Sequence, residues 1–278
     1  MLAICNGSSL VRVEERARSR HEKILRGDNA LVSNNQAQKK CWASCLGGCS
    51  DKISREHTIT QAMFLDKEIE VSGMPWCVEP KKVGLANLTM KVLCVAHNSA
   101  LSPVDEEAVK FADALRESFR LLQVRLGQER KRWTFIKFPI DGPRIERWFL
   151  KTLINATYQT ESPIEDSSLV EIAFGRKPFE PNAGLYGVYD PPEKRQLFDG
   201  ISVSSFTVRG RVVGATFSFL GFRLLLYLDK RGPELPFMEV GTEHGRISEI
   251  IEPTYHPLQI GYQAGKGTSH AVVFQWHT

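Results

Sequence analysis

Cysteine and histidine side chains are concentrated in one stretch of this chain, between residues 41 and 105. The stretch holds five of the six cysteines, four of them in two segments that read CWASCLGGC and LCVAHN. Thiolate sulfur and imidazole nitrogen are preferred zinc ligands, and structural zinc sites commonly take two ligands from each of two short segments. In a reducing compartment, cysteines grouped in this way indicate a metal site rather than disulfides.

The second segment supplies the clearer pair of metal ligands. Cys94 and His97 are separated by two residues, which is a standard spacing for a zinc-binding turn. In the first segment, Cys41, Cys45 and Cys49 recur at intervals of four and allow two choices. We predict Cys45 and Cys49, because the two glycines between them supply the tight backbone that lets two thiolates converge. Cys41 is the alternative.

Two further motifs accompany the metal-binding segments. A Glu-His pair, Glu56-His57, lies between the two segments, and Asn98 directly follows His97. A Glu-His pair alone would carry little weight, because surface and core histidines are common. Its position between two metal-binding segments, with an asparagine adjoining the second, makes it informative.

The order of these motifs resembles that of the HNH (ββα-metal) nucleases. SREHTIT, residues 54–60, is similar to the element that follows the first metal-binding segment in this family. LCVAHNSALS, residues 93–102, is similar to the second segment, in which a metal ligand directly precedes the active-site asparagine. The resemblance covers residues 41–105 and is greatest to members with an embedded zinc, including phage resolvases of branched DNA.

The resemblance implies a role for each residue. His57 would be the general base that removes a proton from water, and Glu56 and Asn98 would hold a catalytic Mg²⁺ or Mn²⁺ ion on the scissile phosphate. Oxygen ligands of this kind suit these hard cations. The ligands of the structural Zn²⁺ ion would be Cys45, Cys49, Cys94 and His97.

The sequence departs from the family pattern in two places. The last histidine of the family name has no clear counterpart after Asn98, and Asp105 is the nearest candidate for its position. The two halves of the motif are also far apart, so the hairpin must carry an insertion near residues 66–86. The first departure leaves the shell of the catalytic cation incomplete.

A hairpin and a following helix must position these side chains. Residues 51–60 are expected to form the first strand, and residues 82–93 to contain the strand that leads to Cys94. A further strand is expected at residues 68–71, before a glycine-containing turn. The helix is expected to begin at Asn98.

A long helix and a β-rich region are expected beyond the motif. Ser102-Pro103, followed by acidic residues, is typical of a helix start. A domain boundary is predicted near residues 127–132, and residues 144–154 predict an amphipathic helix with Trp148 facing the core. β-branched and aromatic residues predict strands at 133–140, 184–190, 201–208, 211–219, 222–229 and 270–276.

The composition is that of a soluble globular protein. The chain has 278 residues, of which 42% are hydrophobic, and a net charge of +4. No apolar run reaches the roughly 18 residues of a membrane-spanning helix. The start of the chain lacks the pattern of a secretory signal, so we expect a cytoplasmic protein without membrane contact. Basic residues cluster at 12–26 and 125–132, where they can bind nucleic-acid phosphates.

We therefore predict an α+β protein in three parts. These are a basic helical arm at residues 1–40, a zinc-stabilised ββα-metal (HNH-like) domain at 41–126, and a β-rich domain at 127–278. The predicted function is metal-dependent endonuclease cleavage of phosphodiester bonds, with DNA as the expected partner, in bacterial defence or a mobile element. The alternative is an inactive zinc-stabilised module that binds nucleic acid or serves as a scaffold. The β-rich part could bind a protein partner or a small ligand.

Overall fold

A computed structural model gives the arrangement of most of the chain. It describes residues 2–5, 41–74, 77–126, 135–158, 160, 162–188, 200–232, 237–240, 247–251, 253–263 and 269–276. The predicted helical arm at 1–40 lies outside the described residues, apart from residues 2–5. The basic cluster at 12–26 also lies outside them, and only residues 125 and 126 of the cluster at 125–132 are described.

The largest sheet is antiparallel and has eight strands, in the order β13-β7-β10-β9-β8-β1-β3-β4. The strands are β1 (Leu2–Cys5), β3 (Glu68–Ser72), β4 (Lys81–Gly84), β7 (Gly184–Val188), β8 (Gly200–Val208), β9 (Arg211–Phe219), β10 (Phe222–Tyr227) and β13 (Thr254–Tyr255). Strand β1 joins the two halves of the sheet, because it pairs with β8 on one side and with β3 on the other. The sheet therefore takes strands from both sides of the predicted boundary near residue 127.

Smaller sheets complete the strands of the described residues. β6 (Ile136–Asp141) runs parallel to β15 (Ser269–Gln275), which also pairs with β14 (Gln259–Gln263). β11 (Phe237–Val240) pairs with β12 (Ile247–Ile251). The shortest pair, β2 (Glu56–His57) with β5 (Thr89–Met90), is antiparallel and carries the predicted Glu-His motif.

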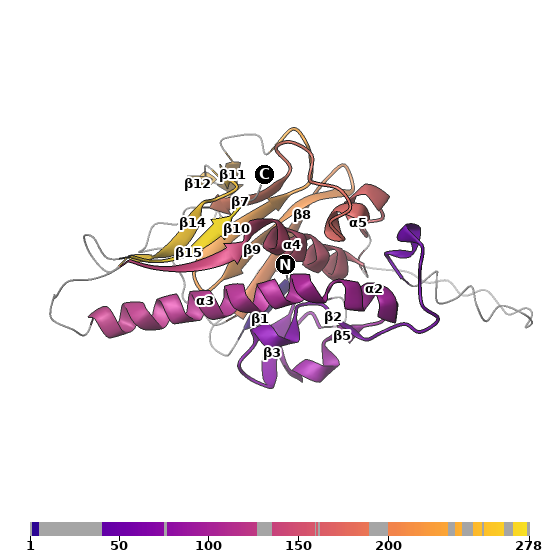
Figure 1. Cartoon of the computed structure of the whole chain (residues 1–278), viewed down its shortest axis with the longest axis horizontal. Helices are drawn as coiled ribbons and strands as arrows, with labels where there is room; N and C mark the ends of the chain where they lie inside the picture. The colour runs from indigo at the N-terminus through magenta and orange to yellow at the C-terminus, as the bar shows by residue number, and fades with distance from the viewer. Residues whose placement is uncertain are drawn as a thin grey trace, which may run out of the picture.

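Helices connect the short β2–β5 pair to the sheets. The α-helices of the described residues are α2 (Val95–Ala100), α3 (Ser102–Leu126), α4 (Gly142–Thr157) and α5 (Ser167–Ala173). Figure 1 shows α3 as a long helix along one side of the sheets, with β2, β5 and α2 near its N-terminal end. The predicted start of the long helix at Ser102 is confirmed.

Aromatic side chains from two helices and two sheets meet in the core. Phe111 of α3 contacts Phe149 of α4, with ring centroids 6.3 Å apart, and Phe274 of β15, with centroids 5.9 Å apart. Phe149 also contacts Phe217 of β9, at 4.7 Å. Trp148 is 2% exposed, which confirms the prediction that it faces the core. Because large aromatic contacts contribute strongly to packing, α3 and α4 are firmly held where they reach the site.

Two predicted elements near the site have different bounds in the structure. The first strand of the hairpin, β2, is shorter than the predicted 51–60. The contacts that precede it include a hydrogen bond from Ser54 N to Leu93 O at 2.9 Å and an isolated bridge between Ile53 and Cys94. The predicted helix at 144–154 is longer and begins at Gly142. Asp141 accepts a hydrogen bond from Arg144 N at 3.0 Å and caps that helix.

Candidate metal centre and polar pocket

Three cysteines and one histidine gather at the start of α2. The possible ligand atoms of Cys41, Cys49, Cys94 and His97 all lie within 4.8 Å of one another. Each sulfur faces the same nitrogen: the distances to His97 Nδ1 are 3.4 Å from Cys41, 3.6 Å from Cys49 and 3.2 Å from Cys94. We refer to these four residues as the Cys–His cluster.

The dimensions of the Cys–His cluster fit a tetrahedral zinc ion. With Zn–S bonds of about 2.3 Å and Zn–N bonds of about 2.0 Å, tetrahedral angles separate sulfur from nitrogen by about 3.5 Å. The three measured sulfur–nitrogen distances run from 3.2 to 3.6 Å. The arrangement can therefore hold a metal ion, and its donor set of three thiolates and one imidazole is typical of structural zinc.

Cys45, which we predicted as a ligand, lies outside the cluster, and the alternative, Cys41, lies within it. Cys45 lies in a 3-10 helix, η1 (Ser44–Leu46), and its side chain is exposed. Because η1 is a turn between Cys41 and Cys49, it brings those two residues to the cluster and directs Cys45 to solvent. Cys41 is 2% exposed, and the Trp42 N–H donates to Val92 O at 3.0 Å, which ties this segment to the chain that leads into Cys94.

Local backbone features hold the remaining ligands of the cluster. Gly47 and Gly48 have φ values of +72° and +69°, which residues with side chains rarely adopt, and they turn the chain from η1 toward Cys49. Cys94 is the N-cap of α2, and its sulfur accepts a hydrogen bond from His97 N at 3.4 Å. The helix therefore begins at Val95, three residues before the predicted Asn98.

Burial favours the neutral thiol form of two of the cysteines until a cation binds. Burial raises the pKa of Cys41 to about 12, and burial also raises the pKa of Cys49. For Cys94, burial acts in the same direction, but hydrogen bonds from the His97 backbone and from Ser50 outweigh it and lower the pKa. Since thiolates and not thiols bind metals, an ion in the cluster must displace protons from Cys41 and Cys49.

The aromatic ring of Phe174 packs against the cluster. The Phe174 ring, next to α5, lies edge-on to the His97 ring, with centroids 5.4 Å apart, and edge-on to Trp42 at 5.7 Å. Burial lowers the pKa of His97 and keeps its ring neutral, the state in which imidazole binds a metal. A hydrogen bond with the Gly47 backbone acts against this shift, and such contacts are typical of metal-binding histidines.

Helix α2 also contributes to a polar cavity of about 210 Å³. Its His97 belongs to the cluster, and the next residue, Asn98, lines the cavity. We refer to it as the polar pocket. Its lining residues are Arg55, Glu56, His57, Thr60, Gln61, Asn98, Ser99, Ser102, Asp105 and Lys151. The structure thus brings the predicted trio of Glu56, His57 and Asn98 to one cavity, together with Asp105.

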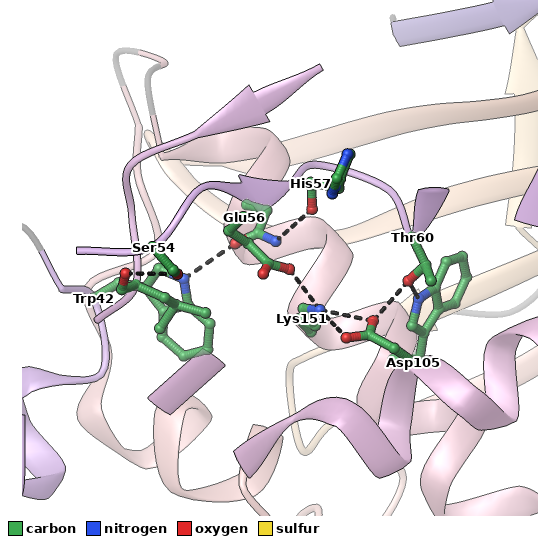
Figure 2. Close-up of polar contacts among 10 residues, drawn as sticks. Trp42, Ser54, Glu56, His57, Thr60, Asp105 and Lys151 are labelled. Atoms are coloured by element: carbon green, nitrogen blue, oxygen red, sulfur yellow. Dashed lines mark hydrogen bonds and ion pairs between the residues drawn. The ribbon is translucent and has the colours of Figure 1, made fainter. Parts of the chain in front are cut away.

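Lys151 of α4 lies at the centre of the charged groups of the pocket. Its Nζ is 2.6 Å from Glu56 Oε1 and 2.7 Å from both carboxylate oxygens of Asp105. Figure 2 shows the ammonium group between the two carboxylates. The side chains of Lys151 and Glu56 are only 3% and 6% exposed. This is a buried ion-pair network in which one ammonium group pairs with two carboxylates.

Neutral side chains fix the outer edge of this network (Figure 2). Thr60 Oγ1 donates to Asp105 Oδ1 at 2.6 Å and accepts from Trp148 Nε1 at 2.9 Å. On the other side, Asn155 Nδ2 donates to the His57 carbonyl at 3.4 Å, and its Oδ1 accepts from Trp42 Nε1 at 3.1 Å. The pocket is therefore held by contacts that join β2, α3 and α4.

The two titratable groups of the Glu-His pair are shifted in opposite directions. Burial raises the pKa of Glu56, although Lys151 acts against that shift. Burial, and then the charge of Lys151, lower the pKa of His57, while Asp105 acts the other way. His57 is therefore neutral at physiological pH. Its Nε2 is buried and has no hydrogen-bond partner among the described residues, and Figure 2 shows its ring directed away from the Glu56 carboxylate.

The predicted catalytic Mg²⁺ or Mn²⁺ ion does not fit this arrangement. Glu56, its expected carboxylate ligand, is ion-paired with Lys151 and receives a further hydrogen bond from the Asn155 side chain. A divalent ion sharing that carboxylate would lie about 4 Å from the ammonium. At an effective dielectric constant of about 20, the repulsion between a double and a single positive charge would be about 8 kcal/mol.

Lys151 is the residue that sequence reasoning missed. It lies in the predicted helix at 144–154, three residues after the buried Trp148 and four before the buried Asn155. A lysine on the apolar side of an amphipathic helix is rarely buried unless it has an anionic partner. The place of Lys151 on the apolar side of the helix therefore indicated a buried ion pair. The sequence does not show which carboxylates form that pair.

Within the described residues, no helix has the combination of length and apolar character needed to cross a membrane. Comparison with known proteins found no matching family model, no similar curated protein and no similar solved structure.

Proposed function

We propose that the protein is an endonuclease of the HNH type that hydrolyses phosphodiester bonds, with a structural zinc ion in the Cys–His cluster. The observation that supports this most directly is that Glu56, His57 and Asn98 line one cavity beside a group of four residues able to bind a metal. Glu56 and His57 are neighbours on β2, whereas Asn98 comes from α2, about forty residues later in the chain. Their meeting in a polar cavity is expected for a reaction site and is not required for packing.

The local topology supports the same proposal. β2 and β5 are antiparallel, with Glu56 opposite Met90 and His57 opposite Thr89, and α2 follows β5 in the chain. Two antiparallel strands and a helix, with a metal ligand set around the helix start, are what the ββα-metal resemblance implies. We propose that β2, β5 and α2 correspond to that unit.

The chemistry assigned to His57 follows from its protonation state. A neutral imidazole can take a proton from water, and its lowered pKa keeps it in that state. In the proposed reaction the water oxygen bonds to phosphorus, and the bond from phosphorus to the leaving sugar oxygen breaks. The leaving oxygen receives a proton from solvent. We assign the binding of phosphate oxygens to Asn98 and Arg55, which also line the cavity.

The zinc ion would have a structural role in this proposal. All four of its ligands come from protein side chains, so a tetrahedral ion has no open position for substrate. Binding the ion fixes the segment around η1 against the start of α2. Because Asn98 follows the ligand His97, the ion would also fix where the amide of Asn98 stands in the pocket.

A plasmid-nicking assay tests the proposed function. Zinc-loaded protein should convert supercoiled DNA to open circles, and His57→Ala should abolish the conversion while the zinc content stays at the wild-type value. His256→Gln is the matched control, because His256 does not line the pocket and glutamine can keep its hydrogen bond to Glu146. Single-stranded DNA and RNA, tested in parallel, identify the preferred substrate.

The alternative, an inactive nucleic-acid-binding module, predicts a different result. Wild type and His57→Ala would then bind DNA equally, and neither would cut it with or without added divalent cations. Equal background nicking by both proteins would show that a contaminant is responsible, and the endonuclease proposal would be abandoned.

A further inference from the structure

The strongest feature that the proposed mechanism leaves unused is the buried lysine of the polar pocket. We infer that the ammonium of Lys151 occupies the position of the divalent cation that the resemblance implies, so that the pocket acts without a bound Mg²⁺ or Mn²⁺ ion. The inference rests on the proposed function for its catalytic part. Its structural part, that Glu56 and Asp105 bind Lys151 and not a metal, can be tested without any activity.

The hydrogen-bond capacity of the ammonium matches its surroundings. A lysine ammonium has three N–H donors, and three carboxylate oxygens lie within 2.7 Å of Lys151 Nζ: one from Glu56 and both from Asp105. The group is therefore saturated by the protein. A site built for Mg²⁺ would instead keep several waters around the ion and use one or two carboxylates.

The position of the lysine is fixed from both sides. Asp105 is held by the hydroxyl of Thr60, which in turn accepts a hydrogen bond from Trp148. Lys151 and Trp148 both belong to α4, so the helix that supplies the cation also orients its main partner. The cation is thus part of the fold, at the place where β2, α3 and α4 meet.

Lys151 is a positioning residue in this account and not a catalytic one. Its three donors are already used, so it does not bind the phosphate without losing a carboxylate. Its positive charge offsets one of the two negative charges in the wall of a pocket that must accept an anion. Two uncompensated carboxylates in that wall would repel a phosphate group.

Removing Lys151 should convert the space between the Glu56 and Asp105 carboxylates into a metal site. In Lys151→Ala, the carboxylates of Glu56 and Asp105 would face a common point without a cation. Oxygen ligands in that arrangement are suited to Mn²⁺. The variant should therefore acquire an affinity for Mn²⁺ that the wild type lacks.

Equilibrium dialysis with Mn²⁺, read by electron paramagnetic resonance on zinc-loaded protein, tests the inference. The wild type should bind no Mn²⁺ in the concentration range in which Lys151→Ala binds one equivalent. The double variant Lys151→Ala/Glu56→Gln should lose that equivalent. Mn²⁺ should also raise the thermal midpoint of Lys151→Ala and leave that of the wild type unchanged.

The wild type alone keeps the inference falsifiable if Lys151→Ala does not fold. One equivalent of Mn²⁺ bound to the wild type and lost in Glu56→Gln would overturn it, as would nicking that depends strictly on added Mg²⁺ or Mn²⁺. Nicking that persists in metal-depleted buffer supports it. A protein that binds no Mn²⁺ and cuts no substrate would refute the proposed function but would support the structural part of this inference.

Discussion

The Cys–His cluster and the polar pocket share helix α2, yet they balance charge in opposite ways. In the cluster, burial raises the pKa of Cys41 and Cys49, and no lysine or arginine lies among the four ligands. In the pocket, Lys151 lies between two carboxylates. The first site has to bind an external cation before Cys41 and Cys49 become charged, whereas the second receives a cation from the chain itself.

The difference shows that metal-ligating residue types do not identify a metal site by themselves. Glu56, Asn98 and Asp105 are all suitable ligands for Mg²⁺, and they line one cavity. Lys151 on α4 determines which cation the cavity holds. Its buried ammonium lies 2.6 Å from Glu56 Oε1 and pairs with that carboxylate without any added metal ion. Removing the cation of each site in turn tests this difference between the two sites.

Loss of a zinc ligand should have the largest effect. Cys41→Ser should release the metal and unfold the segment around η1, because binding free energies of about 10–16 kcal/mol are typical of structural zinc and contribute directly to folding. Zinc content measured by mass spectrometry and amide hydrogen exchange over residues 41–100 check this result.

Cys45→Ser is the matched control for the cluster, because Cys45 is exposed and lies outside the ligand set. It should keep one zinc ion per chain and the wild-type thermal midpoint. Zinc lost from Cys45→Ser but kept by Cys41→Ser would reverse the assignment of the two cysteines.

Removal of the internal cation should come next in size. Lys151→Met leaves Glu56 and Asp105 without their partner, and breaking a buried ion pair of this kind costs about 3–5 kcal/mol. Urea unfolding of zinc-loaded protein measures the loss. Lys177→Ala, which removes an exposed lysine paired with Glu171, should leave the urea midpoint unchanged. An equal loss of unfolding free energy in both variants would mean that the buried ion pairs of the pocket stabilise the fold no more than an exposed pair.

Loss of the hydrogen bonds of Thr60 should destabilise the fold less than loss of Lys151. Thr60→Val removes the hydrogen bond to Asp105 and leaves Trp148 Nε1 without its acceptor, for a cost of about 1–3 kcal/mol. The same urea experiment measures it. If the Thr60→Val loss depends on Lys151 in a double-mutant cycle, the two residues belong to one network. Strict additivity would separate them.

The smallest effect concerns the protonation of His57. Burial and Lys151 lower its pKa below the ordinary value of about 6.5, so the folded protein releases this proton more readily than the unfolded chain. His57 therefore stabilises the fold above pH of about 6.5, and that contribution is lost as the pH falls through the folded pKa. NMR titration should show a lowered pKa that rises in Lys151→Met. An unchanged pKa in that variant would show that Lys151 does not act on the ring.

The parts of the site that are local in sequence were predictable. Cys94 and His97 lie on one helical turn, so their spacing alone brings them together. The choice between Cys41 and Cys45 was not predictable in this way, because it depends on the direction of the turn at η1. Both cysteines have equivalent spacing in the sequence, and only the folded backbone shows which one faces inward.

The long-range parts could not be derived from patterns. Strand β1 inserts between β3 and β8 and joins segments that the sequence assigned to different domains. Lys151 meets Glu56 and Asp105 from another helix, and neither carboxylate has a spacing that indicates this partner. Periodicity predicts that a helix is amphipathic, but it does not show which charged groups the buried face will meet.

The metal content of the protein tests the central claim most directly. Wild-type protein equilibrated with both Zn²⁺ and Mn²⁺ and then desalted can be analysed by mass spectrometry. We predict one zinc ion and no manganese per chain, with the zinc absent from Cys41→Ser. One zinc and one manganese, with the manganese absent from Glu56→Gln, would contradict the claim that the pocket supplies its own cation.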